Sequence, residues 1–205
     1  MMPRRLAIAG IDKDLIDALR GDPRYVVVAL FDPAPIASAC GIPVAGGDDA
    51  FAAWIAGNPD ARYVMAVDIP ALRRKLVAGP YASGTPETLI CQHAHVSPDA
   101  TIGRGAIVMR GAVVSADAMI GAFAKINADT AIHHDCVVGD YVTLAPGCRL
   151  LGNVAVGESA YIGAAACVLP RRRVGADARL GAGGVAIHDI PAGVTATGVP
   201  ARSRT

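Results

Sequence analysis

Aliphatic residues recur at every sixth position through the second half of the chain. The register runs without insertion or break over sixteen positions: Ile90, Val96, Ile102, Val108, Val114, Ile120, Ile126, Ile132, Val138, Leu144, Leu150, Val156, Ile162, Val168, Val174 and Leu180. A period of six matches neither the 3.6-residue period of a helix nor the two-residue alternation of a half-buried strand. It is typical of a parallel β-helix, in which three consecutive repeats form one coil. We therefore predict that residues 87–205 form a β-helix with a C-terminal tail.

Two further patterns support stacked coils. The residue two positions before each aliphatic is mostly small, which suits a narrow core filled at native density. Several apolar residues also lie outside the repeat positions, among them Val113, Met119 and Val137. Flat outer faces with such residues favour packing against copies of the same chain, and we expect a homotrimer.

The N-terminal part of the chain shows a different pattern, in which apolar strands alternate with helical segments. We predict strands at 4–9, 25–31 and 62–67 and helices at 12–20, 48–56 and 70–78. This alternation predicts a small Rossmann-like βαβαβ domain over residues 1–80. Turn-forming residues are concentrated just after it, and we expect residues 81–86 to be a linker.

A parallel α/β domain offers a ligand crevice at the carboxyl ends of its strands. Gly10 follows the first predicted strand and Asp32 follows the second, so both are candidates for contact with a sugar or a nucleotide. The alternative is that Asp32, which precedes Pro33, caps a turn without any ligand. Asp12 and Asp14 would stabilise a helix N-terminus but would repel a phosphate placed there.

Composition narrows the possible partners. A net charge of +1 and an aromatic content of 4% give no reason to expect nucleic acid. We see no leader segment and no apolar run long enough to cross a bilayer, and we expect a cytoplasmic protein. The five cysteines lack close metal-type or redox-type spacing, which favours free thiols.

One dense cluster of ionisable residues interrupts the repeats, at His133-His134-Asp135. A histidine can act as a general base near neutral pH, and a neighbouring carboxylate can orient it. The alternative is a corner of solvated polar residues. A metal site is not expected, because zinc needs three or four ligands and the other histidines show no matching spacing.

Several motifs follow one another at characteristic spacings: Ile126-Asn127, His134-Asp135-Cys136-Val137-Val138-Gly139-Asp140, Ala145-Pro146-Gly147, Gly152-Asn153-Val154 and Gly198-Val199-Pro200-Ala201. Together they resemble the sialic-acid O-acetyltransferase family of hexapeptide-repeat sugar O- and N-acyltransferases. That family includes N-acetyltransferases acting on nucleotide-linked 4-amino sugars. The resemblance implies a left-handed β-helix and acetyl-CoA as co-substrate.

The resemblance also implies roles for particular residues. His134 matches the general base, and Asp135 matches its acidic neighbour. Gly152, Ala164 and Ala182 match positions along the acyl-CoA groove between two subunits. Asn127 is a candidate contact to the sugar.

We therefore expect an acetyl-CoA-dependent N-acetyltransferase acting on a nucleotide-linked amino sugar in bacterial surface-glycan synthesis. A sugar O-acetyltransferase and a non-catalytic β-helix scaffold are the alternatives. A zinc enzyme on the same fold is a further one. The chain departs from the family pattern at the loop Gly10–Asp14, where a glycine-rich segment with a histidine is usual, and at Val67 and Thr143.

Overall fold

The computed structural model describes residues 2–203 and divides the chain into two compact units, 1–89 and 90–205. The division lies between Leu89 and Ile90, so the expected linker 81–86 belongs to the first unit. Tyr81, in that segment, is fully buried against an aromatic cluster and donates a hydrogen bond of 2.7 Å to Asp48 Oδ1. The turn-forming residues here make a tight turn, in which the amides of Ala82 and Gly84 donate to the carbonyls of Gly79 and Tyr81.

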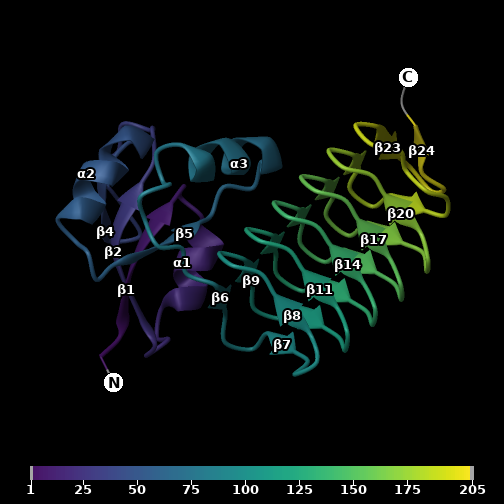
Figure 1. The fold of residues 1–205 in the computed structure, drawn as a ribbon, viewed down its shortest axis with the longest axis horizontal. Coiled ribbons are helices and arrows are strands. Elements are labelled where there is room, and N and C mark those ends of the chain that lie inside the picture. Colours follow the sequence, from purple (N-terminus) through teal and green to yellow (C-terminus); the bar gives the residue numbers. More distant parts are fainter. Residues whose placement is uncertain (1, 204–205) are drawn as a thin grey trace. The chain divides into compact units, whose positions relative to one another are not determined.

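The first unit is a parallel sheet with short helices (Figure 1). Its strands, in the spatial order β3-β4-β2-β1-β5, are Ser38–Ala39, Ile42–Gly46, Tyr25–Phe31, Arg4–Ala9 and Arg62–Met65. Strands β4, β2, β1 and β5 pair in parallel, whereas β3 pairs antiparallel to β4. The helices are α1 (Lys13–Leu19), the 3-10 helix η1 (Asp48–Ala50), α2 (Phe51–Ala56) and α3 (Pro70–Ala78). Strand β2 is apolar throughout and β1 is apolar from Leu6 onward, as is typical of the buried strands of a parallel sheet.

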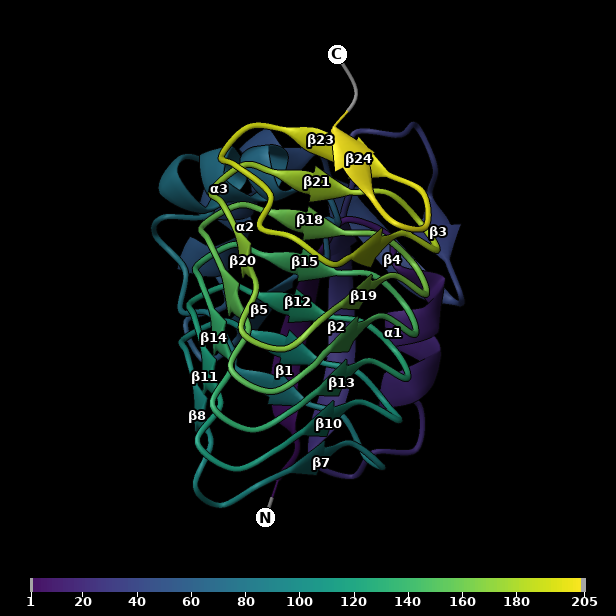
Figure 2. The same ribbon diagram turned by 90° about the vertical axis from the view of Figure 1, so that its right-hand side faces the viewer.

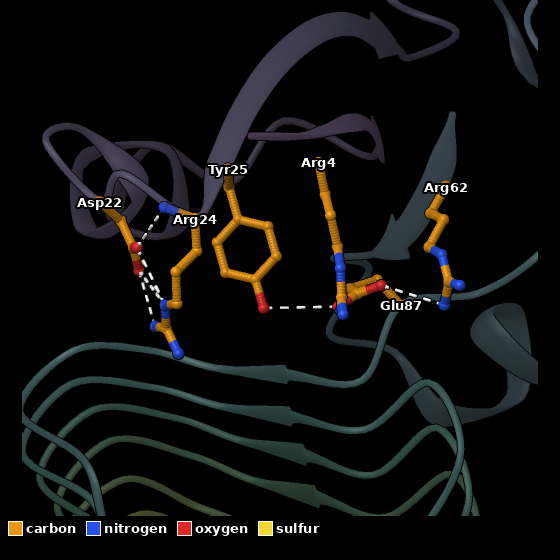
Figure 3. A network of polar contacts seen from close by, with 6 residues as sticks. All are labelled: Arg4, Asp22, Arg24, Tyr25, Arg62 and Glu87. Atoms are coloured by element: carbon orange, nitrogen blue, oxygen red, sulfur yellow. Dashed lines mark hydrogen bonds and ion pairs between the residues drawn. The ribbon is translucent and has the colours of Figure 1, made fainter. Parts of the chain in front are cut away.

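An ionic network lies near the amino ends of β1, β2 and β5 (Figure 3). The Glu87 carboxylate, with its side chain only 2% exposed, forms ion pairs with Arg4 and Arg62. Tyr25 Oη lies 3.4 Å from Glu87 Oε1, and burial together with the Glu87 charge raises the pKa of the tyrosine. A buried carboxylate requires such partners, because an unpaired charge in the interior is costly.

Beside this network, Asp22 is bound by its own partner, Arg24. The Arg24 guanidinium donates to both carboxylate oxygens of Asp22. These hydrogen bonds hold the pKa of the carboxyl below its usual value.

The second unit is a parallel β-helix whose short strands form three ladders (Figure 2). The first ladder contains β7 (His95–Val96), β10 (Val113–Val114), β13 (Ala131–Ile132), β16 (Arg149–Leu150), β19 (Cys167–Val168) and β22 (Val185–Ala186). The second contains β8 (Thr101–Ile102), β11 (Met119–Ile120), β14 (Val137–Val138), β17 (Ala155–Val156) and β20 (Arg173–Val174). The third contains β6 (Leu89–Ile90), β9 (Ile107–Val108), β12 (Lys125–Ile126), β15 (Thr143–Leu144), β18 (Tyr161–Ile162), β21 (Arg179–Leu180), β23 (Thr195–Thr197) and β24 (Arg202–Ser203).

Every repeat aliphatic from Ile90 to Leu180 is the second residue of a strand. Most of these side chains are fully buried in one continuous core, with the small residues between them. Burial of each contributes about 1.5–3 kcal/mol before the entropy of ordering is subtracted. The core thus fixes which residues of each repeat remain at the corners, where the polar side chains stand.

Candidate active site

The corner that follows the first ladder carries the ionisable cluster. Its successive coils present Ala116-Asp117, His134-Asp135, Gly152-Asn153 and Pro170-Arg171, each pair one coil after the last. The second residue of each pair has a left-handed backbone, with φ between 58° and 62°. Aspartate and asparagine tolerate this conformation better than most residues. The left-handed backbone therefore helps to explain why Asp135 and Asn153 occupy equivalent positions on neighbouring coils.

Backbone hydrogen bonds join these corners from coil to coil. The amide of Asp135 donates to the Ala116 carbonyl at 3.2 Å, and the amide of Asn153 donates to the His134 carbonyl at 3.0 Å. The amide of Arg171 likewise donates to the Gly152 carbonyl at 3.0 Å. His134 and Gly152 are consequently held as direct neighbours.

His134 and Asp135 form a hydrogen-bonded pair. The distance from His134 Nδ1 to Asp135 Oδ2 is 2.6 Å, and the two side chains are 63% and 49% exposed. When Nδ1–H donates to this carboxylate, Nε2 is left with its lone pair free to accept a proton. The pair can therefore act as a base, and its side chains are accessible from solvent.

Two neighbours from the next coil complete this corner. Asn153 Nδ2 donates to Asp135 Oδ2 at 3.4 Å, and the backbone of Gly152 lies against the edge of the imidazole ring. Sequence reasoning did not give Asn153 a role. The signal that could have found it is its position, which lies one full coil after Asp135.

The other predicted site residues of the β-helix lie on a different corner. Ala164 and Ala182 are exposed at equivalent corner positions on neighbouring coils, after β18 and β21. Within one protomer they are separated from Gly152 by the width of the first ladder. Asn127, after β12, is buried, and its side-chain amide donates to the Leu144 carbonyl at 3.0 Å.

In the first unit, the structure brings Gly10 and Asp32 together. Asp32 Oδ2 accepts from the amide of Ile11 at 3.2 Å, and Oδ1 accepts from the amide of Ala34 at 2.9 Å. Gly10 has a φ of +83°, and a Cβ there would lie 3.1 Å from the Val67 side chain. Asp12 caps helix α1, accepting from the Leu15 amide at 2.9 Å. The carboxylates of this loop are thus used, at least in part, to hold the loop itself.

Two absences among residues 2–203 bear on other functions. No group of three or more His, Cys, Asp or Glu side chains in this range is arranged to hold a metal ion. No helix in this part of the chain is long and apolar enough to cross a membrane.

Comparison with known proteins places this chain among sugar acetyltransferases. The family model "Bacterial transferase hexapeptide (six repeats)" matches residues 117–152, the segment that contains the histidine–aspartate pair. The acetyltransferase domain of PglB from Neisseria gonorrhoeae FA1090, solved with acetyl coenzyme A, is 30% identical and superimposes with a TM-score of 0.90, covering 98% of this chain and 100% of that one. A histidine-to-asparagine mutant of perosamine N-acetyltransferase from Caulobacter crescentus, solved with CoA and GDP-perosamine, is 35% identical with a TM-score of 0.90, covering 98% and 96%.

This chain belongs to the hexapeptide-repeat sugar acyltransferases. Membership confirms the predicted architecture of a Rossmann-like domain followed by a left-handed β-helix. A further relative of this acyltransferase family is the GDP-perosamine N-acetyltransferase of Escherichia coli O157:H7, 39% identical over 72 residues. That alignment spans 33% of this chain and 33% of the relative.

Proposed function

We propose that this acyltransferase transfers the acetyl group of acetyl-CoA to the amine of a nucleotide-linked amino sugar, for use in bacterial surface glycans. The observation that carries the proposal is the hydrogen-bonded His134–Asp135 pair. It stands on an exposed corner of a chain that aligns over nearly its whole length with a perosamine N-acetyltransferase. That relative was solved with both CoA and GDP-perosamine, which supports the same classes of donor and acceptor here.

The reaction needs a base at the attacking nitrogen. In our proposal, His134 Nε2 takes a proton from the sugar amine as the nitrogen attacks the thioester carbonyl of acetyl-CoA. The tetrahedral intermediate then collapses, the carbon–sulfur bond breaks, and the proton passes to the departing CoA sulfur. Asp135 holds the ring by Nδ1 and stabilises the imidazolium that forms between the two proton transfers. No acyl-enzyme is required.

We assign the donor and the nucleotide part of the acceptor to different elements. We assign the acyl-CoA to a groove that includes Gly152, Ala164 and Ala182, where small residues allow close approach to the backbone. A backbone N–H at Gly152 is the candidate for stabilising the oxyanion. We assign the nucleotide part of the acceptor to the Gly10 and Asp32 loop, and keep Asn127 as a candidate sugar contact through its carbonyl oxygen.

We also propose a homotrimer. Apolar side chains stand exposed on the ladders either side of the His134 corner: Val113 (39%), Met119 (55%) and Val137 (46%). Association through these faces would bury the three side chains. It would also allow the corner of Ala164 and Ala182 in one protomer to meet the His134 corner of the next. Light scattering should give the trimer mass; a monomer at working concentration would refute the proposed trimer.

We place the reaction in the cytoplasm, where acetyl-CoA and nucleotide sugars are available.

The direct test is CoA thiol release from acetyl-CoA with GDP-, UDP- and dTDP-linked amino sugars, beside the same sugars without a nucleotide. We expect turnover with a nucleotide-linked amino sugar. The isolated product should resist alkaline hydroxylamine, because an amide does so under mild conditions and an O-acetyl ester does not. A hydroxylamine-labile product would favour the O-acetyltransferase, and no turnover or CoA binding would favour a scaffold.

A further inference from the structure

Gly152 occupies a corner position that does not itself require glycine. The equivalent position, the second one after each repeat aliphatic, holds alanine, proline, arginine, glutamine, aspartate, glutamate or histidine in every other repeat from 92 to 182. Gly152 is the only glycine among these sixteen positions. Its φ lies outside the left-handed region, so the backbone would accept an alanine there without strain.

The atoms around Gly152 show what a side chain would meet. A Cβ placed there would lie 2.7 Å from both Cε1 and Nε2 of His134, and 3.5 Å from its Cδ2. These three ring atoms are its nearest neighbours. By contrast, a Cβ on Gly121, Gly139 or Gly157 would strike the backbone of the next coil. The glycine at 152 is therefore matched to a side chain, the imidazole of the preceding coil.

We propose that Gly152 is a positioning residue for His134: the missing Cβ lets the imidazole lie over the next coil with Nδ1 on Asp135 and Nε2 free. This inference rests on the proposed function, in which His134 is the base. It is distinct from the role of Gly152 in admitting the donor, because it acts through the ring and concerns the chemical step. Asn153, donating to Asp135 from the same coil, fixes the carboxylate end of the arrangement.

The effect of a Cβ at 152 follows from the exposure of the ring. His134 is 63% exposed, so its ring can swing into solvent and the coil need not unfold. A swung ring loses the 2.6 Å contact to Asp135 and moves Nε2 away from the acceptor. Displacement of a reacting group by about 1 Å costs about a hundredfold in rate.

The test is Gly152→Ala, measured by steady-state kinetics and by calorimetry with CoA. We expect kcat to fall by about a hundredfold, while the KM for acetyl-CoA and the CoA affinity stay within about twofold of the wild type. Ala116→Gly, at the same corner position two coils earlier, is the matched control and should keep the wild-type kcat. A raised KM with unchanged kcat would assign Gly152 to donor binding alone and overturn the proposal, as would unchanged kinetics.

A second comparison separates this inference from the proposed function. In a His134→Ala background, adding Gly152→Ala should leave the residual rate unchanged, and a further large loss would show that Gly152 acts independently of the ring. Crystal structures of the wild type and Gly152→Ala test the placement without any activity. Loss of the Nδ1–Oδ2 contact in the variant supports the inference even if the wild type proves not to transfer acetyl groups, and an undisturbed ring refutes it.

Discussion

The corner at His134 and the loop at Gly10 and Asp32 hold their polar groups in different ways. On the β-helix corner, stacked coils fix the backbone, and the side chains of His134 and Asp135 are bonded to one another and exposed. In the first unit, the Asp32 carboxylate accepts from the Ile11 and Ala34 amides, and Asp12 caps α1. On the corner, Nε2 of His134 makes no bond to Asp135 and can take part in proton transfer. In the loop, the carboxylates accept hydrogen bonds from nearby backbone amides and so help to hold the loop in place. This contrast is in keeping with our proposal, in which the corner carries out the chemistry and the loop binds the acceptor.

Removing the acidic partner of His134 should reduce activity more than any change in the Gly10 and Asp32 loop. In Asp135→Asn the ring loses its charged partner, and the imidazolium formed during the reaction is less stable. We expect kcat to fall by roughly one to two orders of magnitude, less than for a buried pair because solvent screens this one. The KM values for both substrates should change little. A variant that keeps the wild-type kcat would detach Asp135 from the chemical step.

A change in the loop should instead alter acceptor binding. In Asp32→Ala a hydrogen bond to the nucleotide sugar would be lost and the Ile11 amide released. We expect the KM for the nucleotide sugar to rise about tenfold, with kcat at saturation and the KM for acetyl-CoA unchanged. Product formation over a range of acceptor concentrations measures this. A fall in kcat alone would bring Asp32 into the chemistry and remove the contrast between the two regions.

The smallest expected effect concerns stability, outside both regions. Asp22 has its pKa lowered by hydrogen bonds from Arg24, so its contribution is present above the unfolded pKa of about 3.9. That contribution is lost as the pH falls through the lower, folded value. Asp22→Asn should cost about 1 kcal/mol at pH 7 and less at low pH. Urea unfolding at both pH values checks this, and an equal cost at the two would exclude the charge as its source.

The two regions also differed in how far the sequence could predict them. In the β-helix each aliphatic is placed by its own repeat, so the register located every strand from β6 to β21. In the first unit the segments at β1, β2 and α3 were predicted with their observed bounds, but β3 and β4 were not predicted. Strand β4 is short, contains Pro43 and forms by pairing with β2, a contact that local pattern does not encode. The segment 81–86 was expected to be a linker, yet its Tyr81 packs into the aromatic core.

The candidate site shows the same limit. The repeat places His134 and Gly152 on neighbouring coils, since their positions differ by three repeats. It does not say which way the imidazole turns, because that depends on the bond to Asp135 and on the space above the glycine. By the same count, Ala164 and Ala182 lie two and five repeats after Gly152, which places them on another corner within one protomer.

The central claim is that His134 is the base, and its direct test is kcat for His134→Ala with acetyl-CoA and a nucleotide-linked amino sugar. Calorimetric CoA binding serves as the control for folding. General base catalysis contributes about 10²–10⁴-fold, so we predict a loss of that size with CoA affinity within about twofold of the wild type. A variant that turns over at a rate comparable to the wild type would contradict the account.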